Sequence, residues 1–461
     1  MPCATPPLLA VPGSLPDFWP HRVIFFANLR SLFFGNNAET DELCHTVGNV
    51  DSYGGRLLPI LNVLFRGSGN ILVLECEPDA ALLRYFRNRL GLKPPEYRVI
   101  DHRTYQEIGR LARSGTARDI EARLPAIRDW SGAVIDGYVT DSTLTAIADT
   151  HALRTLCSPE GSWRGNNKLL LHTFLEQSGL PVFETIIATT PADLPGALAA
   201  LHDRGFRRAV VKAQIGASGI GLRRVDLPAS SAEIARIPAM LFHEGPCLVQ
   251  GWIEPGVNDV AAIRSPSVQL FVGDDSIHLY DLTEQILSRD SIHEGNEAIP
   301  RFLRRDAALK HDMLAITGAA ARWLHAQGYR GPGSADFVVA FDRDGRAHPP
   351  ILCEINARIT GATYPAVLAR LLAPAGAWLM RNIRFPSAPA GTAILQALDT
   401  ADLLYRRGAA TGLLPINFNP HPRGGIAKAQ LLALAPSLRE CRQMIDTLPD
   451  RLHLEITHDR D

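Results

Sequence analysis

The chain has 461 residues, of which 46% are hydrophobic and 21% are charged, and its formal net charge is −1. This composition is typical of a globular protein of about two to four domains, and it excludes a global electrostatic attraction to nucleic acid or to an anionic membrane. No apolar run reaches the roughly 18 residues that span a bilayer, and the N-terminus lacks the basic start of a signal peptide, so we expect a cytoplasmic protein. The seven cysteines form no C-x-x-C motif, which favours reduced thiols that are mostly buried.

The first third of the chain predicts a small Rossmann-like α/β domain over residues 1–157. Residues 1–20 are rich in proline and are expected to form an irregular arm. Short apolar runs with strand character follow at "RVIFFANL" (22–29), "NILVLECEPD" (70–79), "EYRVID" (96–101) and "GAVIDGYV" (132–139), and the helix-like "AALLRYFRNRL" lies among them. Alternation of strands and helices favours a parallel sheet. The first strand is not followed by G-x-G-x-x-G, which disfavours a dinucleotide site.

Residues 158–375 have a different pattern, in which helices flank longer β-rich stretches. "KLLLHTFLEQSGLP" (168–181) predicts a helix with a glycine C-cap, and "ALKHDMLAITGAAARWLHAQGY" (308–329) predicts a long one. "AVVKAQIGASGIGLRRV" (209–225) reads as strand, glycine loop and strand, and residues 333–356 read as a β-hairpin with the turn "DRDG". Beyond residue 376, "ILQALDTADLLYRRG" and "AKAQLLALAPSLRECRQMI" show apolar patterns with helical character, so 376–461 forms a third, C-terminal α/β region.

The glycine loop "GASGIG" follows Lys212 directly at the end of a strand. Glycine lets backbone N–H groups approach an anion closely and point together, and the lysine brings a positive charge to the same place. We interpret this stretch as a flap that closes over phosphate. A plain hairpin turn beside an exposed lysine remains the alternative.

Three oxygen-bearing side chains meet at one end of the predicted hairpin. Asp336 in "SADF" and Glu354 in "EIN" lie on its two strands, and Asn356 follows. Alternation along the strand places Glu354, Asn356 and Arg358 on one face. Two carboxylates and an amide suit Mg²⁺, which keeps substrate phosphates as further ligands. Acids on strands are otherwise often solvated, but the apolar "PILC" before Glu354 favours a paired or liganded carboxylate.

The order of these motifs resembles that of ATP-grasp ligases. Lys168, Lys212, the glycine loop, "LVQGWIEPG", "SADF" and "EINAR" carry this resemblance over about residues 160–375. It implies an ATP-grasp fold, in which two α+β subdomains clasp ATP, between a Rossmann-like pre-ATP-grasp domain and a C-terminal extension. "TEQIL", "HEGN" and "EINARITGATYP" are similar to the peptide ligase of pheganomycin biosynthesis and its relatives.

The resemblance also implies roles for individual residues. Lys168 and Lys212 would hold the ATP phosphates, and Arg358 would steady the transferred phosphate. The flap over the phosphates would use Gly216, Ser218, Gly219 and Gly221. The hinge that reads adenine would comprise Gln250, Gly251, Trp252 and Ile253, with Gln250 in place of the glutamate of many members. Asn258 or its neighbour Asp259 would contact the ribose. Asp336, Glu354 and Asn356 would bind Mg²⁺.

The activity implied is an ATP-dependent carboxylate–amine ligation. A small carboxylic acid or amino acid would form an acyl phosphate with release of ADP, and an amine or peptide acceptor would then displace phosphate. Candidate substrate residues from the "TEQIL" and "HEGNEAIPRFL" stretches and the loop after Arg358 are Glu284, Gln285, His293, Arg301 and Thr360. An ordinary polar loop is the alternative for them, and His293 has no second histidine spaced to share a metal.

Other functions fit the same motifs. An ATP-grasp ligase can load an amino acid onto a carrier-protein thiol, and the basic "LRRV" and "RFLRR" segments could then dock an acidic carrier. A non-catalytic nucleotide-binding regulator is disfavoured by the intact lysines and acids. Biotin-dependent carboxylation is another ATP-grasp activity, but the sequence lacks a biotinyl Met-Lys-Met segment. A homodimer is compatible with the sequence.

Overall fold

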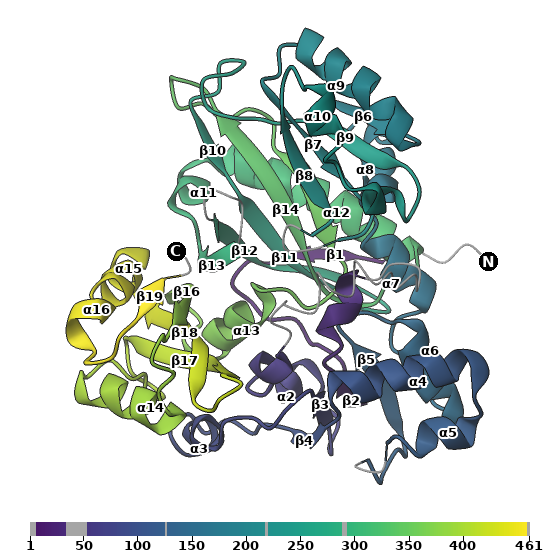
Figure 1. Cartoon of the computed structure of the whole chain (residues 1–461). Coiled ribbons are helices and arrows are strands. Elements are labelled where there is room, and N and C mark those ends of the chain that lie inside the picture. The colour runs from purple at the N-terminus through teal and green to yellow at the C-terminus, as the bar shows by residue number, and fades with distance from the viewer. Residues whose placement is uncertain (1–5, 34–52, 125–126, 217–219, 288–292, 459–461) are drawn as a thin grey trace.

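The structure of the chain is a computed structural model that describes residues 6–33, 53–124, 127–216, 220–287 and 293–458. The described residues form one parallel sheet of four strands, one small sheet of four strands and one large sheet of eleven. Figure 1 shows the parallel sheet below, the small sheet above, and the large sheet running between them into the C-terminal strands. The small antiparallel sheet and the large mixed one are called the small sheet and the large sheet below.

The N-terminal domain contains the predicted parallel sheet, with the strand order β4–β3–β2–β5. Its strands are β2 (Arg22–Phe26), β3 (Ile71–Leu74), β4 (Glu96–Val99) and β5 (Ala133–Gly137). Its helices are η1 (Leu29–Phe33), η2 (Gly54–Leu57), α2 (Leu61–Leu64), α3 (Ala80–Asn88), α4 (His102–Ser114), α5 (Ala117–Glu121) and α6 (Ser142–Thr150). An aspartate caps the N-terminus of each of the three longest, α3, α4 and α6, by accepting a backbone N–H bond. The Rossmann-like prediction is confirmed.

The small sheet follows two helices and has the order β6–β9–β7–β8. Its strands are β6 (Thr185–Ala188), β7 (Arg208–Lys212), β8 (Leu222–Asp226) and β9 (Cys247–Gly251). The helices of this part are α7 (Pro159–Gly165), α8 (Lys168–Gln177), η3 (Pro191–Asp193), α9 (Leu194–Asp203), α10 (Ser231–Ile234) and η4 (Ala239–Phe242). Gly179, with a φ of +66°, follows the C-cap of α8, as the sequence predicted. The two strands predicted on either side of the glycine loop, β7 and β8, are also confirmed.

The large sheet has the order β10–β14–β11–β12–β13–β16–β18–β17, with β1, β15 and β19 attached at its sides. Its strands are β1 (Leu8–Ala10), β10 (Ala262–Arg264), β11 (Pro266–Val272), β12 (Ile277–Leu287), β13 (His293–Ala298), β14 (Gly331–Phe341), β15 (Ile351–Asn356), β16 (Ala377–Arg384), β17 (Gly412–Pro420), β18 (Ile426–Ala435) and β19 (Thr457–His458). The remaining helices are α11 (Arg301–Arg305), α12 (Ala307–Ala326), α13 (Thr363–Leu372), α14 (Gly391–Thr400), α15 (Leu438–Asp446) and α16 (Leu448–Arg451).

Different helices pack on the two faces of the large sheet. Helix α12 packs on β11 and β12, and α15 packs on β16 and β18. Helix α13 lies between the N-terminal domain and strands β16–β18 (Figure 1), and its contacts are with β14 and β16. The strands beyond residue 376 continue the large sheet through the β13–β16 pair, so the C-terminal region is joined to the central part by backbone hydrogen bonds.

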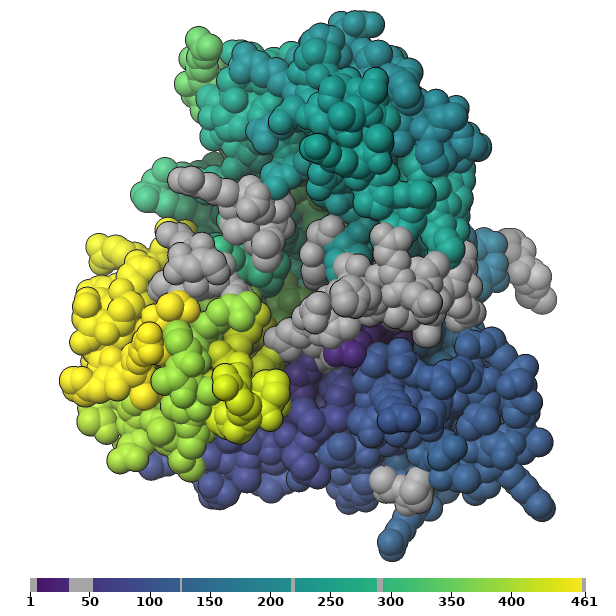
Figure 2. Space-filling view, in the orientation of Figure 1, coloured from purple at the N-terminus to yellow at the C-terminus, as the bar shows by residue number. Residues whose placement is uncertain are grey.

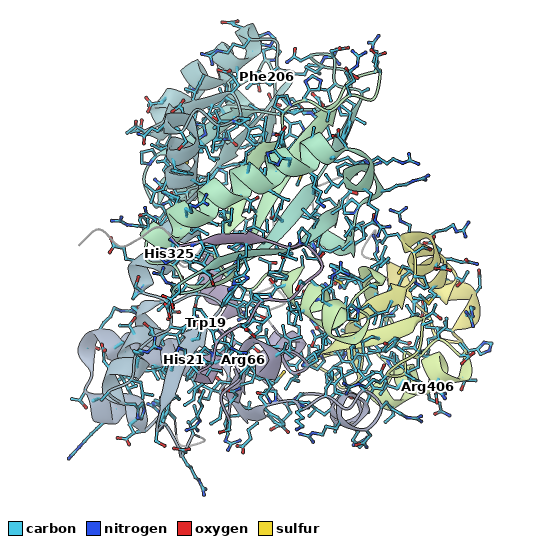
Figure 3. All side chains as sticks on the ribbon, turned by 180° about the vertical axis from the view of Figure 1, so that it is seen from behind. Trp19, His21, Arg66, Phe206, His325 and Arg406 are labelled. Atoms are coloured by element: carbon cyan, nitrogen blue, oxygen red, sulfur yellow. The ribbon has the colours of Figure 1, made fainter. Side chains whose placement is uncertain are left out.

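Two expectations from the sequence are corrected. The N-terminal arm is not wholly irregular, because β1 pairs in parallel with β12, and Phe18 and Trp19 pack against Phe271. Figure 3 shows Trp19 between the N-terminal domain and the large sheet. The "AKAQLLALA" half of the last apolar pattern is strand β18, and only the second half is helix α15. The Ala/Leu run favours a helix locally, but pairing with both β16 and β17 decides its conformation.

The five described cysteines are free. Cys157, Cys247 and Cys441 are buried, as expected, whereas Cys76 and Cys353 are partly exposed. None of the described helices is long and apolar enough to cross a bilayer.

A buried ion pair attaches α13 to the large sheet and predicts a stability effect. The Arg370 guanidinium donates from two nitrogens to the Asp281 carboxylate, at 2.9 and 3.0 Å, and these side chains are 4% and 0% exposed. Arg370→Met should therefore lower the free energy of unfolding by about 3–5 kcal/mol, because it leaves Asp281 buried without its partner. Arg406→Ala, which removes an exposed arginine paired with Asp399, should cost less than about 1 kcal/mol. Urea denaturation measures both variants, and equal losses would contradict the assignment.

Candidate functional site

The site is organised around an ion pair between Lys168 and Glu354. Lys168 is the first residue of α8, and its Nζ lies 2.9 Å from Glu354 Oε1 and donates to the Gly216 carbonyl at 2.8 Å. Asn167 fixes this helix start, because its side chain accepts from the backbone N–H groups of Leu169 and Leu170 and donates to Gln214. The predicted phosphate lysine, metal carboxylate and glycine loop therefore meet at one place.

Lys212 lies at the end of β7, close to this pair. Burial lowers the pKa of Lys212, whereas the neighbouring Cys353 and Glu354 act to raise it. The Lys212 Nζ also lies 5.2 Å from the centroid of the Phe183 ring. A pocket opens here between the small sheet, α8 and β15. It is lined by Lys168, Leu171, His172, Leu175, Val182, Phe183, Lys212, Leu248, Gln250, Leu352 and Cys353.

The carboxylates of Asp336 and Glu354 stand directly opposite each other on β14 and β15. The Asp336 oxygens accept from Ser267 Oγ at 2.6 Å and from Asn356 Nδ2 at 2.8 Å. Burial, with the Glu354 charge, raises the pKa of Asp336 to about 6. Burial would also raise the pKa of Glu354, but Lys168, Arg358 and Lys212 outweigh it and hold this pKa below its usual value. The site therefore pairs a carboxyl group whose pKa is lowered, Glu354, with one whose pKa is raised, Asp336.

Arg358 extends from the strand end onto the same face. Its guanidinium donates to Asn166 Oδ1, and burial lowers its pKa against the opposing effects of Glu354 and Asp336. Asn166 lies two residues before Lys168, so the connection between α7 and α8 positions both cations. Their charges are directed at the Glu354 carboxylate.

The oxygen set fits Mg²⁺. No group of three or more His, Cys, Asp or Glu side chains among the described residues could hold a metal by itself. Mg²⁺ commonly takes one or two carboxylates and completes its shell with water and substrate phosphates. Asp336, Glu354 and the Asn356 Oδ1 oxygen provide that partial set, since the Asn356 Nδ2 is the atom already bonded to Asp336.

The predicted adenine hinge begins beside this pocket. Gln250 lines it and donates to Thr185 Oγ1 at 3.1 Å. The backbone N–H groups of Gly251 and Trp252 already donate to carbonyls of the small sheet, at Glu184 and Arg208. A side chain at Gly251 would collide with the Phe206 ring, which Figure 3 shows within the small-sheet part of the molecule. These two amides are thus engaged in the sheet, and Ile253 follows them partly buried.

The other predicted nucleotide residues are placed as follows. Gly216 and Gly221 form the base of the glycine loop, where the Gly221 carbonyl accepts from Ala213, whereas Ser218 and Gly219 lie outside the described residues. Asn258 is exposed and has a φ of +48°. It lies beside Gly205, at the start of β7, and does not line the pocket that contains Lys168 and Lys212.

Alternation along β12 separates the two substrate candidates there. Ser267 pairs with both Asp336 and Thr283, so Thr283 and Gln285 lie on the Asp336 face. Gln285 hydrogen-bonds with Asp336 accordingly. Glu284 points to the opposite face, where it meets Arg264 at 3.6 Å and stands opposite Glu297. The structure does not bring Glu284 together with the carboxylate pair.

The other three substrate candidates also lie in different places. Thr360 contacts Gln269 at 3.5 Å. Gln269 donates to Ser267, and Ser267 donates to Asp336. These contacts connect the loop after Arg358 to Asp336. His293 hydrogen-bonds with Asn296 at 2.6 Å and packs where a side chain on Gly361 would lie. Arg301 is exposed at the first position of α11.

Sequence reasoning missed several groups near these residues. Burial, together with the charges of Lys428, Arg56 and Arg381, lowers the pKa of His293 to about 4. Arg56 comes from η2 of the N-terminal domain, and its guanidinium lies 5.7 Å from the centroid of the Tyr364 ring. Nothing in their local sequence signals this proximity, which the tertiary fold creates.

Comparisons with known proteins were made for the whole chain, and no family model matches it. The butirosin acyl-carrier protein–L-glutamate ligase of Niallia circulans is 27% identical over 199 residues, which are 43% of this chain and 44% of that protein. The chain therefore matches less than half of the length of this curated relative.

Solved structures resemble almost the whole chain. Biotin carboxylase from Campylobacter jejuni, solved as a complex with β,γ-ATP, has a TM-score of 0.57 at 15% identity and covers 95% of this chain and 93% of its own. N5-carboxyaminoimidazole synthase from Aspergillus clavatus, solved with ADP and 5-aminoimidazole ribonucleotide, has a TM-score of 0.53 at 17% identity, with coverage of 94% and 99%. The ADP complex of the N5-carboxyaminoimidazole ribonucleotide synthetase purK gives 0.54 at 12%, with coverage of 95% and 98%.

These neighbours define the fold of the chain as ATP-grasp. Within that class, this chain has a Rossmann-like domain in front of the ATP-grasp subdomains and a C-terminal extension whose strands continue the large sheet. The predicted fold class is confirmed.

The position of Glu284 predicts a dependence of stability on pH. Burial, with the Glu297 charge, raises the pKa of Glu284 to about 7. The folded state therefore binds this proton more tightly than the unfolded chain does, and the stabilisation, up to about 3 kcal/mol, is complete below about pH 4 and lost as the pH rises through about 7. Relative to Glu284→Gln, the wild type should lose stability over this interval. Melting temperatures measured across it test this, with the exposed Glu96→Gln as control; parallel profiles for wild type and Glu284→Gln would disprove it.

Proposed function

We propose that the chain is an ATP-dependent ligase that activates a carboxylate as an acyl phosphate and passes the acyl group to an amine. The observation that supports this most strongly is the convergence of Lys168, Lys212 and Arg358 on Glu354, with Asp336 beside it, at the end of a pocket. The ATP-grasp fold and the ligase relative agree with it.

The pocket between the small sheet and β15 is the proposed nucleotide site. Its apolar walls suit adenine, and Lys168 and Lys212 in its lining suit the phosphates. The loop that includes Gly216 and Gly221 would cover them, and Gln250 to Ile253 would border the base. Because Asn258 lies away from these residues, it is not included.

In the first proposed step, a substrate carboxylate oxygen bonds to the γ-phosphorus of ATP, and the bond to the β–γ bridging oxygen breaks, with ADP as the leaving group. Two anions must approach each other, so the charges of Lys212, Lys168 and Arg358 stabilise the transition state. Mg²⁺, held by Asp336, Glu354 and Asn356, would supply further positive charge at the phosphates. In the second step, an amine attacks the acyl carbon, phosphate leaves, and the amine loses a proton.

A carrier-protein thiol is the second candidate acceptor. The relative from Niallia circulans is named for an acyl-carrier protein and L-glutamate. In this chain, α11 presents exposed Arg301, Arg304 and Arg305, a surface that suits an acidic carrier. The similarity to pheganomycin-type peptide ligases instead favours a peptide acceptor in natural-product biosynthesis. If the acceptor is a carrier protein, Arg304→Glu should raise KM for the carrier and leave KM for ATP unchanged.

Turnover should release ADP and phosphate, because phosphorylation of a carboxylate cleaves only the terminal phosphoanhydride. Chromatography of the spent nucleotide, with amino acids, short peptides and carrier proteins as substrates, measures this. AMP that accumulates in proportion to product would rule out an acyl phosphate.

Lys212→Ala should impair turnover much more than folding. Loss of a charge-assisted hydrogen bond costs about 1.5–3 kcal/mol, or roughly 10- to 150-fold, and loss of stabilisation specific to the transition state extends this to about 10²–10³-fold. Lys212→Arg should restore activity only in part, since a planar fork does not replace a compact ammonium. ADP release and thermal unfolding with and without Mg·ATP measure both variants. Exposed Lys93→Ala is the matched control; if Lys212→Ala behaves like it, the site is misassigned.

A further inference from the structure

Polar side chains continue across the large sheet from the carboxylate pair into the C-terminal strands. Strand register places Gln285 opposite Asn296, and Asn296 opposite Met380, so Asn382 also lies on the Asp336 face. Asn382 pairs with Gln430, which pairs with Asn417 on the outermost strand. In this polar row, Asn296, Asn382, Gln430 and Asn417 are buried, and burying so many amides is costly unless each finds a partner.

Two oxygens at the far end of the row have no partner among the described residues. They are Gln430 Oε1 and Asn417 Oδ1, on side chains that are 6% and 1% exposed. The amide nitrogens are engaged: Gln430 Nε2 donates to Tyr364 Oη at 3.1 Å and to Asn382 Oδ1 at 3.2 Å. Each of these oxygens can accept a hydrogen bond from an ammonium, amide or hydroxyl group.

Cationic side chains lie around the same end. Lys428 is two residues from Gln430 and on the same face of β18. Arg56 lies over the Tyr364 ring and is held by two bonds to the Tyr53 carbonyl. Its helix, η2, packs against β17. Arg381 lies on the neighbouring strand β16 and pairs with buried Glu294 at 3.1 Å.

The third wall comes from the N-terminal domain. Glu75 follows β3, and Tyr138 follows β5, at the carboxyl ends of the parallel strands, where open α/β sheets bind ligands. Glu75 accepts from the Gly54 N–H, but its Oε1 and the Tyr138 hydroxyl lack partners among the described residues. The charge of Arg56 acts on both of them. Figure 1 shows this end of the domain beneath α13 and close to β17.

We propose that Arg56, Lys428, Gln430 and Asn417 bind the end of the carboxylate substrate that is remote from its reacting group, and that this end bears a second carboxylate and an ammonium. The cations suit the carboxylate, and the unpaired oxygens suit the ammonium. His293 lies between this cluster and the loop after Arg358, because it packs against Gly361 and the charges of Lys428 and Arg56 act on it. The substrate class is an amino dicarboxylic acid. This inference rests on the proposed ligase function and assigns a role to the C-terminal region.

Binding to the full-length protein tests the inference separately from turnover. Calorimetry in the presence of Mg·ADP is performed with amino dicarboxylic acids from L-aspartate to L-2-aminopimelate. Glutarate lacks the ammonium of L-glutamate, and 4-aminobutyrate lacks its second carboxylate. At least one amino dicarboxylic acid should bind about 10-fold or more tightly than its analogue without the second carboxylate. If none does while Mg·ADP binds, the inference is overturned and the nucleotide site stands. If Mg·ADP does not bind, the proposed function fails.

Single substitutions test which residues bind the amino dicarboxylic acid. Lys428→Met and Arg56→Lys should each raise Kd for the amino dicarboxylic acid, the first by about 10-fold or more, with Kd for ADP unchanged. Gln430→Leu should reduce the preference for the amino dicarboxylic acid that binds over its analogue without the ammonium. Arg423→Ala, in the exposed turn between β17 and β18, is the matched control and should leave all values unchanged. Thermal unfolding without ligand shows whether each variant is folded. Folded Lys428→Met and Arg56→Lys proteins with wild-type Kd values would overturn the assignment.

Discussion

The ion pair between Lys168 and Glu354 is the constraint on which the site depends. A carboxylate on a largely buried strand would take up a proton unless nearby positive charge kept it ionised. Three cations do so here, and each comes from a different element: the start of α8, the end of β7 and the loop after β15. The pair therefore joins the start of helix α8 to strand β15 in the hairpin of the large sheet. It also keeps positive charge concentrated where phosphates would bind.

The large sheet uses its two faces for different purposes. One face is covered by α12 and α15 and contributes apolar packing, with Glu284 and Glu297 among the exceptions. The other carries the carboxylate pair and the polar row toward Gln430, under α13. Figure 2 shows the molecular surface hollowed between the small-sheet part and the C-terminal part, above the N-terminal domain. The proposed substrate site at this junction would draw on all three parts of the chain, and the C-terminal strands reach it by continuing the same sheet.

Local patterns in the sequence predicted the parts of the site that are close together in the chain. The hairpin over 331–356 has a short connection, so the facing positions of Asp336 and Glu354 could be inferred from alternation and from the turn. The helix start at Lys168 and the strand before the glycine loop were equally legible. Strand β18 was misread because Ala and Leu favour helices, whereas neighbouring strands determine its conformation. The sequence marks both Glu284 and Gln285 as substrate candidates, but as neighbours on a strand they face opposite sides of the sheet.

The remaining parts could not be read from the sequence, because they depend on contacts between distant segments. Arg56 and Tyr364 are 308 positions apart in the chain and meet only through packing of η2 against β17. Gln430 and Asn417 look like ordinary polar residues within apolar strands. Their significance comes from the oxygens that the fold buries without a partner, which no periodicity indicates.

The most direct test of the central claim is the fate of oxygen in the activated carboxylate. With a substrate whose reacting carboxyl carries ¹⁸O, an acyl phosphate requires that one labelled oxygen pass to inorganic phosphate in each turnover. Mass spectrometry of the released phosphate should therefore show a single ¹⁸O atom per molecule, with none in ADP. Unlabelled phosphate alongside product, or label recovered in AMP, would contradict carboxylate phosphorylation and the site built around Glu354.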